Sequence, residues 1–163
     1  MIALTLKPTR AAKKEFDFVD FEVLSQCATA LVNNINFDKL DRKYTLKIDV
    51  SKYPTNNPCS HYVWKKNAIC IHPLKRYEKP YKLRRFIGFV VHELKHWTQD
   101  KLLKVSFNKN YKDQGMEYYN CPIEQDTRKY TDLVLNAAIK NYNSLLQIKQ
   151  QSLEYKALGI TFY

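Results

Sequence analysis

The stretch of sequence that decides the fold is Arg85-Phe-Ile-Gly-Phe-Val-Val-His-Glu-Leu-Lys-His-Trp-Thr-Gln-Asp-Lys-Leu-Leu-Lys104. Apolar residues recur in it at intervals of three and four, which is the spacing of one face of an α-helix. These residues are Phe86, Phe89, Val90, Leu94, Trp97 and either Leu102 or Leu103. No proline lies between Pro80 and Pro122 to interrupt the pattern. The stretch therefore predicts a central helix around which the rest of the chain packs.

Two histidines and a glutamate within this helix, His92, Glu93 and His96, fit the pattern H-E-x-x-H. Residues four apart project from one face of a helix, so the two imidazoles can hold one zinc ion. Glu93 beside them can take a proton from a metal-bound water. The same pattern also arises by chance, with both histidines as ordinary helix side chains. We favour zinc, because ionisable groups in so apolar a helix are costly to bury without a partner.

The composition predicts a single globular domain spanning residues 1–163. This length buries a core without metal or disulfide staples, and 45% hydrophobic and 26% charged residues are ordinary values for a globular protein. The net charge of +11 is not ordinary. Such a charge favours DNA, RNA, acidic proteins or anionic surfaces as neighbours, although basic surfaces also serve solubility alone.

The expected location is the cytoplasm, without membrane contact. No run of 18 apolar residues occurs, and the first residues lack a charged segment followed by an apolar core, the mark of a signal peptide. The four cysteines, Cys27, Cys59, Cys70 and Cys121, form no C-x-x-C pair. We therefore expect reduced thiols.

The remaining pattern predicts an α+β fold of zincin-like kind. The expected elements are an N-terminal helix capped by Asp17 or Asp20, a three-stranded and mostly antiparallel sheet, the central H-E-x-x-H helix and a long C-terminal helix that begins near Pro122. Residues 1–15 are expected to be a basic lead-in. Residues 150–163 are expected to be a tail, either a short packed helix or a partner contact.

The sheet is predicted from one single strand and one hairpin. Residues 44–50 alternate between apolar and polar, as a half-buried strand does. Residues 59–64 and 68–72 then form a hairpin around Lys65-Lys66, with Tyr62, Trp64, Ile69 and Ile71 on one face. The other face carries Cys59, His61, Val63, Cys70 and His72.

That second face suggests a structural zinc site. A two-residue turn pairs Cys59 with His72 and His61 with Cys70, which would give a Cys2His2 ligand set. We favour a polar outer face with reduced thiols instead. Ligands two residues apart on a strand stand roughly 6–7 Å apart and would have to lean inward.

Residues 75–85 are a candidate nucleic-acid contact. Six basic residues surround Tyr77 and Tyr81 there, a mixture that suits phosphate contacts and base stacking: Lys75, Arg76, Lys79, Lys82, Arg84 and Arg85. A solvated loop that leads into the central helix is the simpler interpretation, and we favour it.

A catalytic zinc site needs a third protein ligand. No histidine follows His96, so the ligand is a carboxylate or a thiolate, and the candidates are Asp100, Asp113, Glu117, Cys121, Glu124, Asp126, Asp132 and Glu154. Glu124 is favoured, because it lies in the first turn of the last helix, where the helix dipole stabilises an ionised carboxylate. Asp126 is a candidate for orienting a ligating histidine.

Three segments resemble the gluzincin-type zinc metallopeptidases, which combine H-E-x-x-H with a downstream glutamate. The segments are Ile69-Cys-Ile71, His92-Glu-Leu-Lys-His-Trp-Thr-Gln99 and Tyr118-Tyr-Asn-Cys-Pro-Ile-Glu-Gln-Asp126, within roughly residues 60–130. The resemblance is closer to small members, namely the SprT-like peptidases and those encoded by phages or mobile elements. Arg128 stands where larger gluzincins carry a supporting aspartate.

The resemblance implies a zinc-dependent peptidase. Zinc would be held by His92, His96 and Glu124, with Glu93 as general base and Tyr118 or Tyr119, the latter preferred, as a donor to the oxyanion. A peptide would bind by strand addition along residues 68–71. The alternative is a basic nucleic-acid-binding or regulatory protein with a catalytically inert zincin fold.

Overall fold

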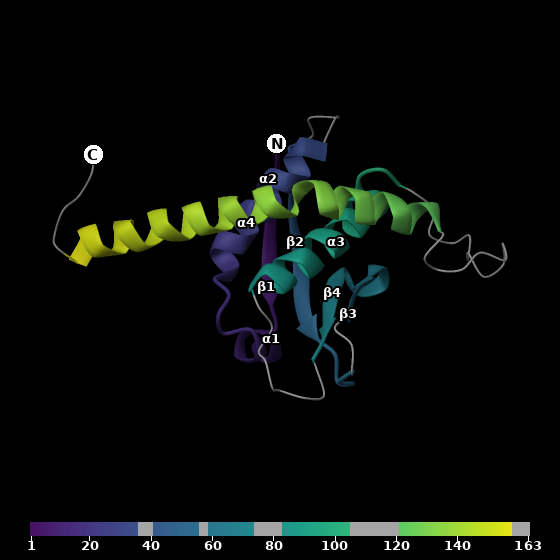
Figure 1. Cartoon of the computed structure of the whole chain (residues 1–163), viewed down its shortest axis with the longest axis horizontal. Helices are drawn as coiled ribbons and strands as arrows, with labels where there is room; N and C mark the ends of the chain where they lie inside the picture. The colour runs from purple at the N-terminus through teal and green to yellow at the C-terminus, as the bar shows by residue number, and fades with distance from the viewer. Residues whose placement is uncertain (36–40, 56–58, 74–82, 105–120, 158–163) are drawn as a thin grey trace.

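The computed structural model describes residues 1–35, 41–55, 59–73, 83–104 and 121–157, without the side chain of Tyr155. Its elements, in chain order, are β1 (Ile2–Pro8), α1 (Arg10–Glu15), α2 (Phe21–Ile35), β2 (Arg42–Val50), β3 (Cys59–Val63), the 3₁₀ turn η1 (Trp64–Lys66), β4 (Ala68–His72), α3 (Leu83–Lys101) and α4 (Pro122–Ala157). Figure 1 shows how they are arranged.

The strands form one four-stranded sheet in the order β1-β2-β4-β3. Strand β2 runs parallel to both β1 and β4, and only β3 is antiparallel to its neighbour, β4. The α+β class is confirmed. The three predicted strands are present as β2, β3 and β4, but the prediction missed β1, and the sheet is not mostly antiparallel because only β3 and β4 pair in that way.

The basic lead-in predicted for residues 1–15 is in fact structured. Ile2, Leu4 and Leu6 are buried, whereas the residues between them are exposed, so β1 has the period of two of a half-buried strand. Residues Arg10–Glu15 form α1, and the Thr9 hydroxyl caps it by accepting a hydrogen bond from the Ala12 amide. The basic side chains lie at solvated positions and do not prevent either element.

Side chains of helix α2 hydrogen-bond to the backbone along the outer edge of β1. Three of its polar residues, four apart, hydrogen-bond to the backbone of three alternate strand residues: Ser25 to Leu6, Thr29 to Leu4 and Asn33 to Ile2. The donor–acceptor distances are 2.8 to 3.1 Å. The match is geometric, because four helical residues rise about 6 Å and two strand residues about 6.6 Å.

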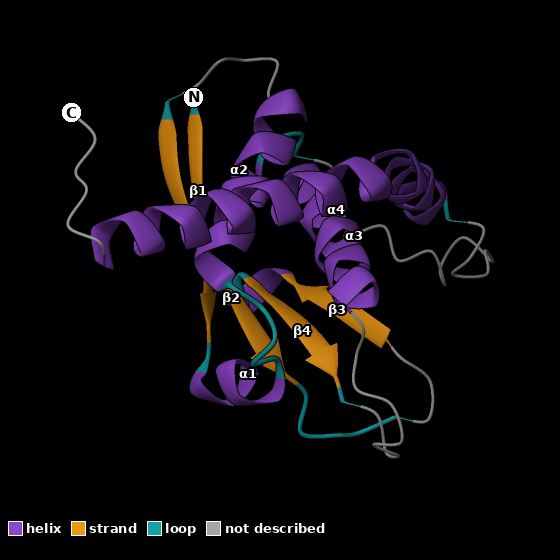
Figure 2. Ribbon diagram, turned by 60° about the vertical axis from the view of Figure 1, so that its left-hand side comes forward, coloured by secondary structure: helices purple, strands orange, loops and turns teal. Residues whose placement is uncertain are grey.

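Helices cover the sheet in two layers (Figure 2). Helices α2 and α3 contact the sheet and each other, and α4 crosses over both. The core between them includes Leu46, Ile48, Ile69, Ile71, Phe86, Trp97 and Tyr142, all fully buried. The C-terminal half of α4 projects beyond the rest of the described chain (Figure 1), and the predicted tail continues this helix as far as Ala157. Residues 158–163 lie outside the described part.

The hairpin has the predicted register. Cys59 faces His72 and His61 faces Cys70. The strand ends at Val63, so Trp64 belongs to η1 and is exposed, and it does not continue the strand face of Tyr62 as predicted. Strand β4 lies between β2 and β3, so residues 68–71 are not a free edge, and strand addition there was wrongly placed. The edge of the described sheet on this side is β3.

A search of the described helices finds none that combines the length and the apolar character needed to span a membrane.

Candidate metal centre

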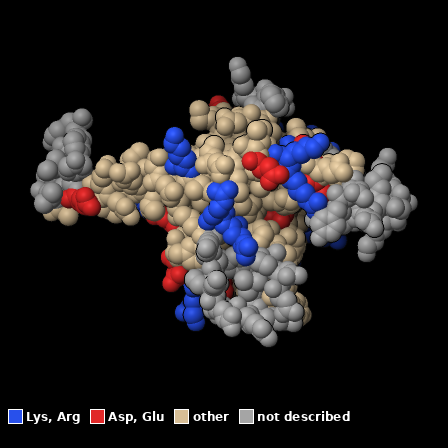
Figure 3. All heavy atoms as spheres, in the orientation of Figure 1, with Lys and Arg blue, Asp and Glu red and all other residues tan. Residues whose placement is uncertain are grey.

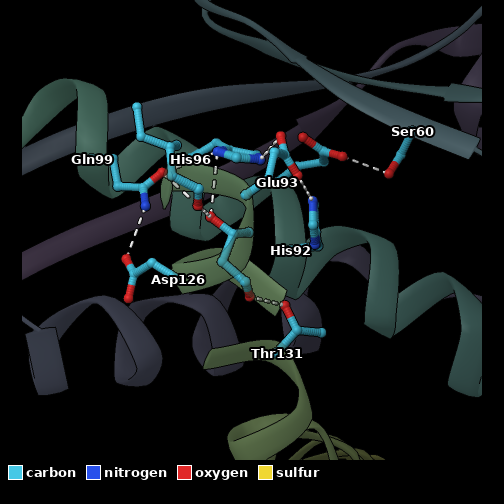
Figure 4. A network of polar contacts seen from close by, with 10 residues as sticks. Ser60, His92, Glu93, His96, Gln99, Asp126 and Thr131 are labelled. Carbon is cyan, nitrogen blue, oxygen red and sulfur yellow. Dashed lines mark hydrogen bonds and ion pairs between the residues drawn. The ribbon is translucent and has the colours of Figure 1, made fainter. Parts of the chain in front are cut away.

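Helices α3 and α4 bring together the three predicted metal ligands, His92, His96 and Glu124, and Figure 4 shows the two histidines beside Glu93. His96 Nε2 lies 3.0 Å from Glu124 Oε1, and His92 Nε2 lies 3.5 Å from Glu124 Oε2. One ligand atom from each residue falls within 4.8 Å of the other two. Glu124 reaches this point from the first turn of α4, which packs against α3. Two imidazoles and a carboxylate on two packed helices can therefore hold one metal ion.

The centre is buried on one side and accessible on the other. Glu93, His96 and Glu124 are buried, whereas the side chain of His92 is 21% exposed. The cluster is therefore reached by solvent on the His92 side.

A chain of hydrogen bonds fixes which nitrogen of His96 faces Glu124. The Asp126 carboxylate accepts from Gln99 Nε2 at 3.0 Å, and Lys95 pairs with the same oxygen at 3.1 Å. Gln99 must then turn its Oε1 toward His96, whose Nδ1 lies 3.0 Å away. An amide oxygen only accepts, so Nδ1 carries the hydrogen. Asp126 therefore contacts Gln99, which in turn contacts His96, and any orienting effect of Asp126 on this histidine would be indirect.

The tautomer of His96 shows whether the three side chains suit a metal ion. With Nδ1 protonated, the neutral His96 ring turns the lone pair of Nε2 toward a carboxylate oxygen 3.0 Å away. Two electron-rich atoms in contact need a cation between them, either a proton or a metal ion. Burial lowers the pKa of His96, but the hydrogen bond to Glu124 and the charges of Glu93 and Glu124 outweigh it and raise the pKa. The site therefore attracts a cation, and its donors fit zinc.

Glu93 lies beside these ligands with one oxygen held and one available. Ser60 of β3 donates a hydrogen bond to its Oε1 at 2.7 Å. Its Oε2 is buried and has no hydrogen-bond partner among the described residues. Burial raises the pKa of Glu93, and the Ser60 hydrogen bond and the two histidines act against that rise. A buried carboxylate with an unengaged oxygen is suited to take up a proton.

The other ligand candidates lie elsewhere. Asp100 accepts a hydrogen bond from the Tyr62 hydroxyl at 2.8 Å and pairs with Lys101, and Glu154 lies near the far end of α4. Cys121 and Asp132 are not in the cluster. Asp113, Glu117, Tyr118 and Tyr119 fall outside the described residues, so the oxyanion donor stays a prediction.

Two residues of the centre escaped the sequence analysis. Ser60 lies in a strand 33 residues before Glu93, and nothing in the local pattern marks it. Thr127 Oγ1 lies 3.4 Å from both His96 Nδ1 and Gln99 Oε1, one turn after Glu124. Its position three residues after a ligand, on the same face of the helix, is the signal that could have found it.

The basic side chains of the described residues can be followed on one face of the molecule. On the face in Figure 3, the described Lys and Arg side chains form separate groups with acids among them. Most of the basic segment 75–85 lies outside the described residues. Nucleic-acid association stays a prediction from the net charge.

Comparison of the chain with models of protein families, with curated proteins and with solved structures gives no match. The assignment of the centre therefore depends on its own geometry: a buried His92–His96–Glu124 cluster that can hold a metal ion.

Proposed function

We propose that the chain is a zinc-dependent peptidase that hydrolyses peptide bonds at this centre. The observation that carries the proposal is the meeting of His92, His96 and Glu124 around one point, with Glu93 beside them. Structural zinc sites almost always use four protein ligands, whereas the three ligands here, with His92 partly exposed, leave a position for water and substrate. Hydrolysis is favoured over a structural role for that reason.

His92, His96 and Glu124 would hold the ion. When bound, zinc supplies the Lewis acidity that makes a water molecule nucleophilic near neutral pH and polarises a carbonyl group.

Glu93 acts as the general base in this proposal. Its Oε1 is fixed by Ser60, so Oε2 is the oxygen that receives the proton of the attacking water and returns it to the departing amine. Burial keeps bulk water away from this oxygen, which preserves the proton for the leaving group.

Strand β3 is the proposed binding edge for the substrate. It forms the outer strand of the described sheet on the side of the centre, and Ser60 lies on it in contact with Glu93. An extended peptide paired with β3 would gain backbone hydrogen bonds and lie next to the ligands. Tyr119 is proposed as the donor to the oxyanion, and Tyr119→Phe is the variant that tests this role.

The test combines metal analysis with a peptidase assay on an unfolded protein substrate. Wild type and Glu93→Gln are expected to contain one zinc ion in the centre, whereas His96→Ala and Glu124→Ala are expected to lose it. Only wild type should cleave the substrate. Glu93→Gln is the matched control, because it keeps all three ligands. A folded wild type without zinc, or a Glu93→Gln variant as active as wild type, would overturn the proposal.

A further inference from the structure

The hairpin carries a second cluster of metal-ligating side chains, on the face that points away from α3. It consists of His61 on β3 and of Cys70 and His72 on β4, and one ligand atom from each lies within 4.8 Å of the other two. His61 faces Cys70 in the strand register, and His72 follows two residues later on the same face. The neighbouring residues Ser60 and Ile71 point the other way, toward α3 and the core.

The two imidazoles are already oriented toward one point. His72 Nδ1 lies 3.1 Å from the Tyr53 carbonyl oxygen, which only accepts, so this nitrogen carries the hydrogen. Its Nε2 then has a lone pair, which faces His61 Nδ1 at 3.1 Å. A backbone carbonyl that holds the outer nitrogen of a histidine is the usual support of a metal ligand.

The observed separation, which is that of a hydrogen bond between the two rings without an ion, is also close to the one that a shared ion would need. Two imidazole nitrogens about 2.0 Å from one tetrahedral zinc ion stand roughly 3.3 Å apart, close to the 3.1 Å between His61 and His72. The objection from sequence, that positions two apart on a strand are too distant, applies to the backbone alone. The side chains of His61 and His72 extend toward each other across the two strands, so their ring nitrogens lie close enough to share an ion.

We propose that His61, Cys70 and His72 bind a second zinc ion, on the opposite side of the hairpin from the first centre. Two imidazoles and a thiolate are ligands for zinc. Calcium and magnesium require oxygen ligands and would bind poorly here. Cys59, opposite His72, has its sulfur 3.9 Å from the Thr55 hydroxyl and lies outside the three-atom cluster. The three clustered side chains would fill three of the four tetrahedral positions of the ion, and a water molecule would fill the fourth.

The second ion would fix the edge strand. His61 directly follows Ser60, and the ligands on β4 lie across the pair. Tying β3 to β4 on the outer face therefore holds the register that places Ser60 on the inner face against Glu93. This consequence rests on the proposed function of the first centre, whereas the metal site itself does not.

The experiment uses the full chain with His92→Ala and His96→Ala, which removes the first centre. This double variant is titrated with Co²⁺ and, separately, analysed for zinc. We expect one ion per chain and a thiolate-to-cobalt charge-transfer band, which the His2Glu centre cannot produce because it has no sulfur ligand. Adding Cys70→Ser should abolish the band, and adding His61→Ala, at an exposed position, should abolish ion binding. Ser60→Ala, on the same strand but the other face, should keep both signals.

Two results would overturn the site: absence of ion and band in the folded double variant, or a band that persists after Cys70→Ser. Circular dichroism of each metal-free variant shows whether it is folded. If the Cys70→Ser variant is unfolded, the loss of ion binding in the His61→Ala variant tests the site instead. If the first centre binds no metal ion, the measured ion count is different. A chain with wild-type His92 and His96 would then bind a single ion and still show the band.

Discussion

The Ser60 hydroxyl donates a hydrogen bond of 2.7 Å to Glu93 Oε1, and this contact joins the edge strand of the sheet to the proposed general base on α3. The hydroxyl holds one carboxylate oxygen and leaves Oε2 available for the proposed proton transfer. The orientation of the base thus depends on a residue outside the metal-binding helix.

Ser60→Ala is expected to reduce kcat roughly 10- to 100-fold, the usual effect of losing a group that orients a catalytic residue. The zinc content and KM should change little, because no ligand is touched. Steady-state kinetics with metal analysis measures both effects. Ser60→Thr keeps the hydroxyl and should recover most of the activity. An unaltered kcat in Ser60→Ala would show that Glu93 does not need this contact.

Gln99→Ala is expected to weaken zinc binding roughly 10- to 100-fold, because His96 loses the acceptor that fixes its tautomer. Competition with a chromophoric chelator measures the affinity. Gln99→Glu, which keeps an acceptor oxygen near His96 Nδ1, is the matched control and should bind zinc more tightly than Gln99→Ala. Equal affinities for the two variants would contradict the orienting role.

Asn67 is expected to stabilise the hairpin turn in two separable ways. It adopts a left-handed conformation, with φ 46° and ψ 55°, and its Oδ1 accepts from Trp97 Nε1 at 3.1 Å while its Nδ2 donates to the Thr45 carbonyl at 2.7 Å. Asn67→Gly keeps the backbone freedom but leaves the Trp97 donor without its acceptor, a loss of about 1–3 kcal/mol in the free energy of unfolding.

Asn67→Ala should lose about 1–2 kcal/mol more than the glycine variant, because alanine is strained in the left-handed region. Urea unfolding of the metal-free chains measures both values. If the alanine variant proved as stable as the glycine variant, the backbone part of this argument would be wrong.

Asp20 is expected to make stability depend on acid pH. Its Oδ1 caps α2 by accepting from the Val23 amide at 3.0 Å, and its Oδ2 accepts from Lys149 at 2.8 Å. Burial raises the pKa of Asp20, but the hydrogen bonds from Lys149 and from the Val23 amide outweigh it, so the net pKa is lowered. A carboxyl whose pKa is lower in the folded state stabilises above its unfolded pKa and loses this effect as the pH falls through the folded value.

Asp20→Ala should therefore lower the free energy of unfolding by about 1 kcal/mol at neutral pH, and this difference should shrink as the pH falls below about 4. Urea unfolding at a series of pH values provides the test. Asp20→Asn keeps a capping oxygen and should lose less than Asp20→Ala at neutral pH. A difference that stays constant down to strongly acidic pH would rule out the charge of Asp20 as its source.

The sequence predicted helices α2, α3 and α4 and the ligand cluster, because both depend on short-range spacing, whereas it missed the short helix α1. His92 and His96 are one turn apart in any helix, and Glu124 follows Pro122 at a helix start, so their meeting required only that α3 and α4 pack together. The hairpin register followed equally from local pairing.

The missed features depend on contacts between distant segments. The alternation of Ile2, Leu4 and Leu6 was hidden by the basic residues that follow it, and its partner β2 lies some 40 residues away. Parallel pairing needs a crossover, here α2, and no local pattern announces it. Ser60 was missed for the same reason, since only the folded hairpin brings it to Glu93.

The side chains of α2 that occupy the edge of β1 limit how this protein can associate with itself. Ser25, Thr29 and Asn33 already bind the backbone groups that a neighbouring molecule would need at that edge. A sheet that continues from molecule to molecule requires two unpaired edges on each molecule, one for each neighbour. With β1 closed, the described sheet leaves the edge of β3 for pairing with another copy of this chain, which would give a closed pair and protect the protein against fibrous aggregation.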